Sequence, residues 1–169
     1  MAALTMPVPS ESELIAGAAA LIDRCRDGGL KIVTAESCTG GMIATMLTEV
    51  AGSSDVFERG LVSYSNEAKE ELLSVPKTLI DRYGAVSEEV ARAMAVGALA
   101  ASNAELSVSV TGVAGPGGGT PEKPVGLVHF AAARGNNLLH ERCEFGDLGR
   151  NEIRRLSVAQ AFVLLESLV

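Results

Sequence analysis

The spacing of hydrophobic residues along the chain predicts helices and strands in alternation. Apolar residues three or four positions apart are typical of helices, whereas short apolar or alternating runs are typical of strands. The predicted helices span residues 10–28, 42–51, 66–73, 88–101 and 151–168. The predicted strands span residues 30–35, 61–65, 107–111, 127–134 and 138–145.

Turn and capping residues support these boundaries. Ser10 and Glu13 form a capping-box pattern at the start of the first helix, and Asn66 is a good N-cap for the third. The last two strands are joined through Gly135-Asn136-Asn137, which predicts an antiparallel hairpin. We therefore expect an α/β fold, a three-layer α/β/α arrangement with a mixed sheet. Residues 1–169 should form a single domain, with residues 1–9 flexible.

Composition indicates what fills the core. Apolar residues make up 47% of the chain but aromatic residues only 4%, so Ala, Val, Leu and Ile must form most of it. The Ala-rich segment 88–101 has a slim apolar face and should pack close to the sheet.

Charge and cysteine content narrow the function classes. With 14 basic and 21 acidic residues the net charge is -7, and no Lys or Arg block is present, which disfavours nucleic acid as a partner. Three cysteines without CxxC spacing indicate a reducing compartment and no zinc site. The sequence shows neither a signal peptide nor a run of about 20 apolar residues, so we expect a cytoplasmic protein without a membrane span.

Unusual polar or glycine-rich segments follow three of the predicted strands. They read TAESCTGG at 34–41, YSNEAK at 64–69 and TGVAGPGGGTPEKPVG at 111–126. Because ligands of open α/β sheets bind beyond the carboxyl ends of strands, these segments predict one cleft if they converge. The glycine loop has the spacing of neither a P-loop nor a Rossmann turn, which disfavours ATP and NAD; we expect no cofactor and no metal.

The first of these segments contains two candidate nucleophiles, Ser37 and Cys38. A Ser-His-Asp triad has weak support, because His129 and His140 both fall in the predicted hairpin. A Ser-Lys pair with Lys69 is the economical alternative, since a desolvated lysine can lose its proton and act as a base.

Structural roles for the same residues remain open at this point. Ser37 and Thr39 can simply cap a helix, Gly40-Gly41 can allow close packing, Cys38 can be a buried filler, and Lys69 can be a solvated surface residue. A cluster of positive charge, Arg150, Arg154 and Arg155, can equally be a solvated helix start.

Taken together, the motifs are specific. TAESCTGG, AGSSDVFERGLVSYSNEAKEELL (51–73), YGAVSEEVARAMAVGA (83–98) and TGVAGPGGGTPEKPVGLVHFA (111–131) closely resemble the C-terminal domain of the competence/damage-inducible CinA proteins. The resemblance covers nearly the whole chain after about residue 10, and it suggests the stand-alone form, without a molybdopterin-binding-like domain.

This resemblance implies nicotinamide mononucleotide deamidase activity, which converts the carboxamide of nicotinamide mononucleotide to a carboxylate and releases ammonia. It implies Ser37 as the nucleophile and Lys69 as its partner. Further candidates for binding the oxyanion or the substrate are Thr39, Gly40, Gly41, Tyr64, Asn66, Gly112, Gly115, Arg154 and Arg155. Of these, Thr39 to Gly41 would supply backbone N–H groups and Tyr64 would contact the pyridine ring. The phosphate would be bound by Arg154 or Arg155, or by N–H groups of the Gly112 to Gly119 loop.

Two other function classes remain. The chain can be a non-catalytic module that binds a pyridine nucleotide, or an interaction domain related to competence. As partners we expect a pyridine mononucleotide and further copies of the chain in a homo-oligomer such as a dimer. We expect neither nucleic acid nor a membrane as a partner.

Overall fold

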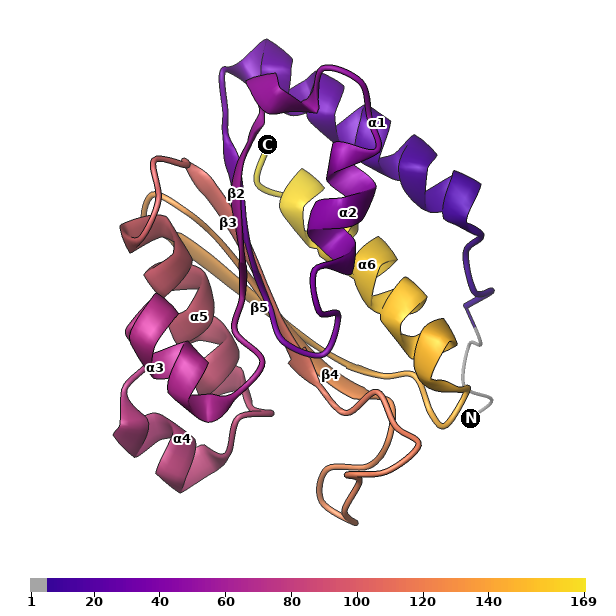
Figure 1. The fold of residues 1–169 in the computed structure, drawn as a ribbon, viewed down its shortest axis with the longest axis vertical. Helices are drawn as coiled ribbons and strands as arrows, with labels where there is room; N and C mark the ends of the chain where they lie inside the picture. The colour runs from indigo at the N-terminus through magenta and orange to yellow at the C-terminus, as the bar shows by residue number, and fades with distance from the viewer. Residues whose placement is uncertain (1–5) are drawn as a thin grey trace.

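The computed structural model describes residues 6–169 as a five-stranded mixed sheet with helices on both faces (Figure 1). The strand order is β2-β1-β3-β4-β5; β1 is parallel to β2 and β3, and the pairs β3–β4 and β4–β5 are antiparallel. The strands are β1 (Ile32–Glu36), β2 (Phe57–Val62), β3 (Leu106–Gly112), β4 (Leu127–Arg134) and β5 (Asn137–Glu144). The predicted three-layer arrangement and the antiparallel hairpin are confirmed.

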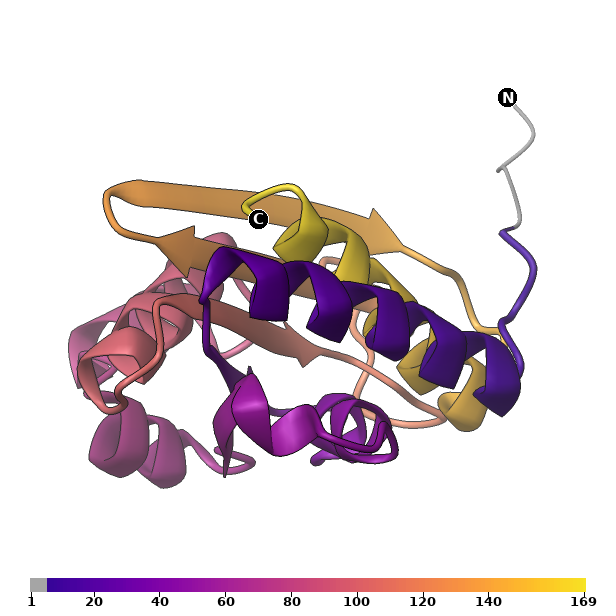
Figure 2. The same cartoon turned by 90° about the horizontal axis from the view of Figure 1, so that it is seen from above.

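The helices form two layers, one on each face of the sheet, which the view from above separates (Figure 2). One layer contains α1 (Glu11–Gly28), α2 (Met42–Thr48) and α6 (Arg150–Glu166). The other contains α3 (Asn66–Leu73), α4 (Lys77–Tyr83) and α5 (Glu88–Ala100). A single 3-10 turn, η1 (Ser53–Asp55), precedes β2.

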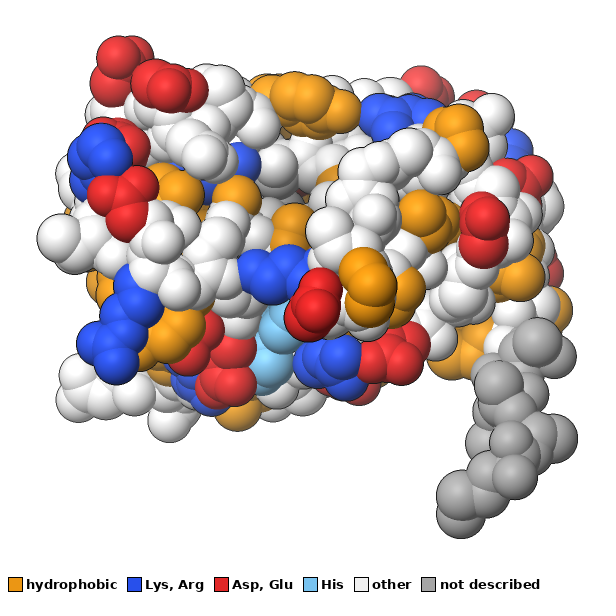
Figure 3. All heavy atoms as spheres, turned by 90° about the horizontal axis from the view of Figure 1, so that it is seen from below, with side chains coloured by type: hydrophobic (Ala, Val, Ile, Leu, Met, Phe, Trp, Pro, Cys, Tyr) orange, Lys and Arg blue, Asp and Glu red, His pale blue; other side chains and the backbone are white. Residues whose placement is uncertain are grey.

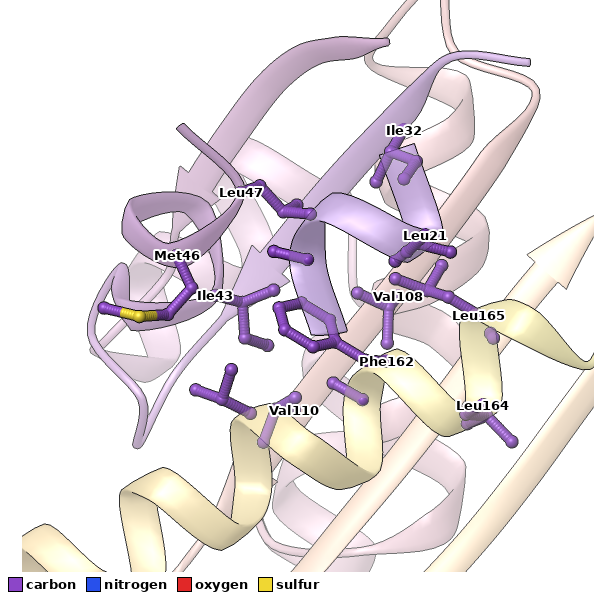
Figure 4. Close-up of a cluster of buried hydrophobic side chains, with 14 of the residues drawn as sticks. Leu21, Ile32, Ile43, Met46, Leu47, Val108, Val110, Phe162, Leu164 and Leu165 are labelled. Carbon is purple, nitrogen blue, oxygen red and sulfur yellow. The ribbon is translucent and has the colours of Figure 1, made fainter. Parts of the chain in front are cut away.

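The larger part of the core lies between the sheet and the first layer. Figure 4 shows Phe162 of α6 among side chains from α1, α2 and the strands, including Leu21, Ile43 and Val108. Apart from four phenylalanines, aliphatic side chains and alanines dominate this cluster, as the composition predicted; the phenylalanines are Phe57, Phe130, Phe145 and Phe162. The capping box is present too, with the Ser10 hydroxyl accepting from the Glu13 N–H and the Glu13 carboxylate accepting from the Ser10 N–H.

The second layer is held close by small residues. Ser107 and Ser109 of β3 donate hydrogen bonds of 2.8 and 2.6 Å to the carbonyls of Ala95 and Ala91 in α5, confirming that this helix packs close to the sheet. On its other side, α5 presses Gly97 against α3. A Cβ atom added at Gly97 would lie 1.9 Å from the carbonyl oxygen of Leu73, so only glycine fits there.

Several elements differ from the sequence predictions. The second strand was predicted at 61–65, but β2 begins at Phe57 and ends at Val62. Ser65 rather than Asn66 caps α3, by accepting from the Ala68 N–H at 3.0 Å. The helix α4 was not predicted, because its seven residues contain too few apolar positions to show a period. Of the segment expected to be flexible, residues 1–5 lie outside the described part; residues 6–9 line a shallow cavity with Leu156 and Ala159.

Candidate active site

The three strand ends singled out in the sequence meet at one cavity of about 310 Å³. It lies at the edge of the sheet where β1 and β3 end, the face seen in Figure 3, on which acidic and basic side chains are interspersed. The cavity is lined by Ser37, Cys38, Tyr64, Asn66, Lys69, Ala85, Val86, Thr111, Gly112, Val113, Ala114, Gly115, Gly117, Gly118 and Arg150. Such a location agrees with the general rule for ligands of open α/β sheets.

Ser37 and Lys69 are in direct contact inside this cavity. Ser37 follows β1, whereas Lys69 projects from the first turns of α3, and the Lys69 Nζ lies 3.0 Å from the Ser37 Oγ. Lys69 is only 1% exposed. Its remaining hydrogen-bond partners are the carbonyl oxygens of Ser63, at 2.9 Å, and Tyr64, at 3.3 Å. Within residues 6–169 no carboxylate pairs with this ammonium group.

This environment favours the neutral amine. Burial lowers the pKa of Lys69 below its ordinary value of 10.5, because charge is costly to hold away from water. When neutral, the amine keeps two N–H donors for the Ser63 and Tyr64 carbonyls, and its lone pair accepts the Ser37 hydroxyl proton. The geometry therefore places the Ser37 hydroxyl next to an amine that is able to act as a general base.

The backbone after Ser37 forms a tight turn. Ser37 donates its N–H to the carbonyl of Val110 on β3 at 2.9 Å, and the Gly40 N–H donates to the Ser37 carbonyl at 3.0 Å. Gly40 and Gly41 have φ values of +56° and +99°, which other residues rarely adopt. Since the Gly40 N–H is already used, it is not free to bind an oxyanion. The N–H groups of Cys38 and Thr39 donate to no oxygen of the described residues.

Glu36 holds the start of α2. Its carboxylate accepts from the N–H groups of Ile43, at 2.9 Å, and Ala44, at 3.1 Å, and the side chain is buried. These are N–H groups that a helix cannot satisfy internally. Glu36 therefore occupies the anion-binding end of α2 itself and makes no contact with Lys69. The sequence contained a signal for this role, an acidic residue shortly before a helix start.

Cys38 lines the cavity but is not activated. Burial raises the pKa of its thiol to about 12, and the nearby Glu36 carboxylate adds to this effect. Because the thiolate is the reactive form, the side chain acts as a small apolar group.

The cavity entrance is bordered by a side chain that was not among the predicted site residues. Arg150, the first residue of α6, donates to the Gly115 carbonyl at 2.8 Å and to the Tyr64 hydroxyl at 3.0 Å. It thereby connects the glycine-rich loop with the segment before α3. The sequence placed Arg150 in the basic cluster, but a helix start predicted one residue later gave no reason to prefer it.

Some of the other predicted site residues lie outside the cavity lining, and others lie in it. Thr39 is fully buried, Gly41 begins α2, and Arg154 donates from its Nη2 to the Thr39 carbonyl at 2.9 Å. Arg155 is half-buried. Tyr64, Asn66, Gly112 and Gly115, by contrast, line the cavity together with Ser37 and Lys69.

The two histidines lie next to each other on the hairpin, away from Ser37. The His129 Nδ1 and His140 Nε2 are 2.9 Å apart, and burial lowers the pKa of His129 to about 4. His129 lines a separate cavity with Glu88 and Lys123. In the described chain, His, Cys, Asp and Glu side chains form no group of three suited to a metal ion. No helix among residues 6–169 is both long and apolar enough to cross a membrane.

Comparisons with known proteins identify the family and the fold of the chain. The family model described as the CinA C-terminal domain matches residues 15–169. A crystal structure of a competence/damage-inducible protein, CihA, from Agrobacterium tumefaciens is similar over 96% of this chain and 98% of its own, with a TM-score of 0.91 and 48% sequence identity.

Two kinds of curated relative are similar in sequence. A CinA-like protein of Citrifermentans bemidjiense is 56% identical over 133 residues, which are 78% of this chain and 32% of the relative. The match covers about a third of the length of this relative and of the CinA-like proteins of Geobacter sp. M21 and Synechococcus sp. RCC307. The nicotinamide-nucleotide amidohydrolase PncC of Escherichia coli K12 is 49% identical over 139 residues, 81% of this chain and 83% of that protein.

Proposed function

The chain belongs to the CinA C-terminal domain family, and from this premise we propose that it is a nicotinamide-nucleotide amidohydrolase that uses Ser37 and Lys69. The substrate would be nicotinamide mononucleotide, and the products nicotinate mononucleotide and ammonia. The similarity to PncC over most of both chains supports the reaction. The observation that carries the mechanism is the 3.0 Å contact between the Lys69 Nζ and the Ser37 Oγ in a cavity at the carboxyl ends of the strands.

In the first half-reaction, neutral Lys69 accepts the Ser37 proton as the Ser37 oxygen bonds to the carboxamide carbon. The carbonyl oxygen becomes an oxyanion, for which the N–H group of Cys38, a residue that lines the cavity, is the proposed donor. The resulting Lys69 ammonium then protonates the amide nitrogen, the carbon–nitrogen bond breaks, and ammonia leaves. Nicotinate remains bound to Ser37 as an ester.

In the second half-reaction, neutral Lys69 accepts a proton from water, whose oxygen attacks the ester carbon. The carbon–oxygen bond to Ser37 breaks, and Lys69 returns the proton to the Ser37 oxygen. One water is consumed and one ammonia is released per turnover. The lysine therefore carries a proton twice and ends each cycle neutral.

The phosphate of the substrate needs a cationic partner at the cavity entrance. Arg150 is suited to this, because it lines the cavity and its guanidinium can exchange the Tyr64 hydroxyl for phosphate oxygens. Tyr64 is 59% exposed, and it would lie beside the pyridine ring or the ribose. The N–H groups of the glycine-rich loop, from Gly112 to Gly118, would complete the site.

The test is ammonia release by the purified protein, with nicotinate mononucleotide identified by mass spectrometry. Nicotinamide mononucleotide, nicotinamide riboside and free nicotinamide should be compared. We expect turnover of the mononucleotide and at least a 1000-fold loss in Ser37→Ala and Lys69→Ala, on the order found when a nucleophile or its base is removed. Ser54→Ala and Lys77→Ala alter exposed residues outside the cavity and are matched controls.

The outcomes separate the alternatives. A protein that binds the mononucleotide without releasing ammonia would be a binding module, and the proposed reaction would be wrong. Full turnover by Ser37→Ala would leave the reaction in place but contradict the Ser-Lys mechanism.

A further inference from the structure

Arg154 is a cation placed under the turn that carries Ser37, on the side opposite Lys69. It projects from α6, and among residues 6–169 no carboxylate lies within salt-bridge distance of it. Its Nη2 donates to the Thr39 carbonyl at 2.9 Å, and it does not line the cavity. A half-buried guanidinium paired only with a carbonyl is energetically expensive, which makes its position informative.

The bond from Arg154 restrains one particular peptide group. The carbonyl of the Thr39–Gly40 peptide accepts from Arg154 and from the Met42 N–H, at 2.9 and 3.0 Å, and its N–H donates to the Ser37 carbonyl at 3.0 Å. Both ends of this peptide are therefore fixed. Because the peptide closes the turn that starts at Ser37, fixing it also fixes the direction of the two N–H groups inside the turn, those of Cys38 and Thr39.

Unpaired polar atoms occur at this same contact. The Thr39 Oγ1 and the Arg154 Nε are both buried, and neither has a hydrogen-bond partner in the described structure. A buried polar atom without a partner costs about 1–3 kcal/mol. Such costs are retained mainly where function requires the geometry. The contact between Arg154 and the turn is thus not one that stability alone would favour.

We propose that Arg154 is a positioning residue that holds the turn so that the Cys38 N–H points toward the oxyanion, and that it does not bind the substrate phosphate. The inference rests on the proposed amidohydrolase function. It assigns different roles to two arginines one helical turn apart on α6: Arg150 faces the cavity and binds phosphate, whereas Arg154 holds the turn from behind.

The test compares substrates with and without a phosphate. In Arg154→Met we expect kcat to fall on the order of 100-fold for both nicotinamide mononucleotide and nicotinamide riboside, the size of effect seen when an oxyanion donor is lost, with KM changed little. In Arg150→Ala we expect a higher KM for the mononucleotide and no change for the riboside. A defect of Arg154→Met confined to the mononucleotide would overturn the proposal and make Arg154 a phosphate ligand.

A second readout does not depend on catalysis. The Gly40 N–H should exchange with deuterium at least tenfold faster in Arg154→Met than in the parent protein, while amides of the β3–β4 ladder keep their protection. If those ladder amides also lose protection, the milder Arg154→Lys variant is measured instead. An unchanged Gly40 rate would overturn the proposal even if the parent protein released no ammonia, whereas a faster rate in an inert protein would contradict only the proposed function.

Discussion

Lys69 and Arg154 reach the same turn from opposite faces of the sheet, and they differ in what surrounds them. Lys69 contacts a hydroxyl and two carbonyls inside the cavity, whereas Arg154 contacts one carbonyl outside it. Lysine can lose its proton when buried, but arginine stays charged in proteins. Under the proposed mechanism, the two basic side chains beside Ser37 therefore have separate tasks: Lys69, which can titrate, moves a proton, and Arg154, which stays charged, holds the backbone.

The largest expected effect comes from replacing Lys69 with arginine, which leaves a permanently charged side chain on both sides of the turn. Lys69→Arg places a permanent positive charge near Ser37 and removes the base, so we expect kcat/KM to fall by about 1000-fold or more. Ammonia release from nicotinamide mononucleotide measures this loss. Lys77→Arg, at an exposed position, is the matched control and should retain full activity. Substantial activity in Lys69→Arg would break the comparison, because a permanent cation would then suffice.

The next effect concerns the third charged group near the turn. Glu36→Ala leaves the N–H groups of Ile43 and Ala44 without their acceptor, which should lower the free energy of unfolding by about 2–3 kcal/mol. Glu36→Gln retains one acceptor oxygen and should lose less. Urea unfolding measures both, with the exposed Glu49→Gln as control. Wild-type stability in Glu36→Ala would mean that Arg154 and the glycines hold the turn unaided.

The pH dependence of the rate identifies which cation titrates. Because only neutral Lys69 accepts the Ser37 proton, kcat/KM should rise about tenfold per pH unit below the lowered pKa of Lys69 and level off above it. The plateau should begin below pH 10.5, the ordinary lysine value. Arg154→Met should lower the whole profile without moving it along the pH axis. A profile that falls with rising pH would contradict Lys69 as the base.

The smallest effect is the pH dependence of stability. The folded-state pKa of Lys69 lies below its unfolded value of 10.5, so the unfolded chain binds more protons between these values. The parent protein should therefore gain stability relative to Lys69→Met as pH rises through that interval, by about 1.4 kcal/mol for each unit of lowering. Thermal melts at several pH values would show the difference in Tm between the parent protein and Lys69→Met changing by a few degrees over that interval. A constant difference would mean that burial of Lys69 carries no charge penalty.

Much of the fold was predictable because local patterns determine it. The strand at 127–134 and the helix at 66–73 lie where their apolar spacing and turn residues place them. The α4 helix was missed because a seven-residue helix carries almost no periodicity of its own and depends on packing against α5. The end of β2 was misplaced because the sequence continues with Ser63-Tyr64-Ser65, an alternating pattern typical of a strand, although pairing with β1 stops at Val62.

The candidate site was predictable only in part. The residue types at 37 and 69 and their position after strands suggested a pair, but the 3.0 Å contact depends on how α3 packs, which no local pattern contains. The choice between Arg150 and Arg154 depends on tertiary packing, because the two lie one turn apart on the same face of α6 and only Arg150 lines the cavity. Glu36 acts through the tertiary fold of the turn, because the helix N–H groups it accepts from lie seven and eight residues further along the chain.

The contact between Gly97 and Leu73 also gives a way to alter the catalytic pair from a distance. Leu73 belongs to α3, the helix that carries Lys69, and a Cβ atom at position 97 has no room beside the Leu73 carbonyl. Any side chain there must push α3 away from α5, and Lys69 moves with it. In protein engineering, a substitution at position 97 should therefore change the separation between Lys69 and Ser37 while leaving every residue that lines the cavity unchanged. In natural variation, we expect a related chain with a side chain at this position to keep Ser37 and Lys69 but to hold them further apart.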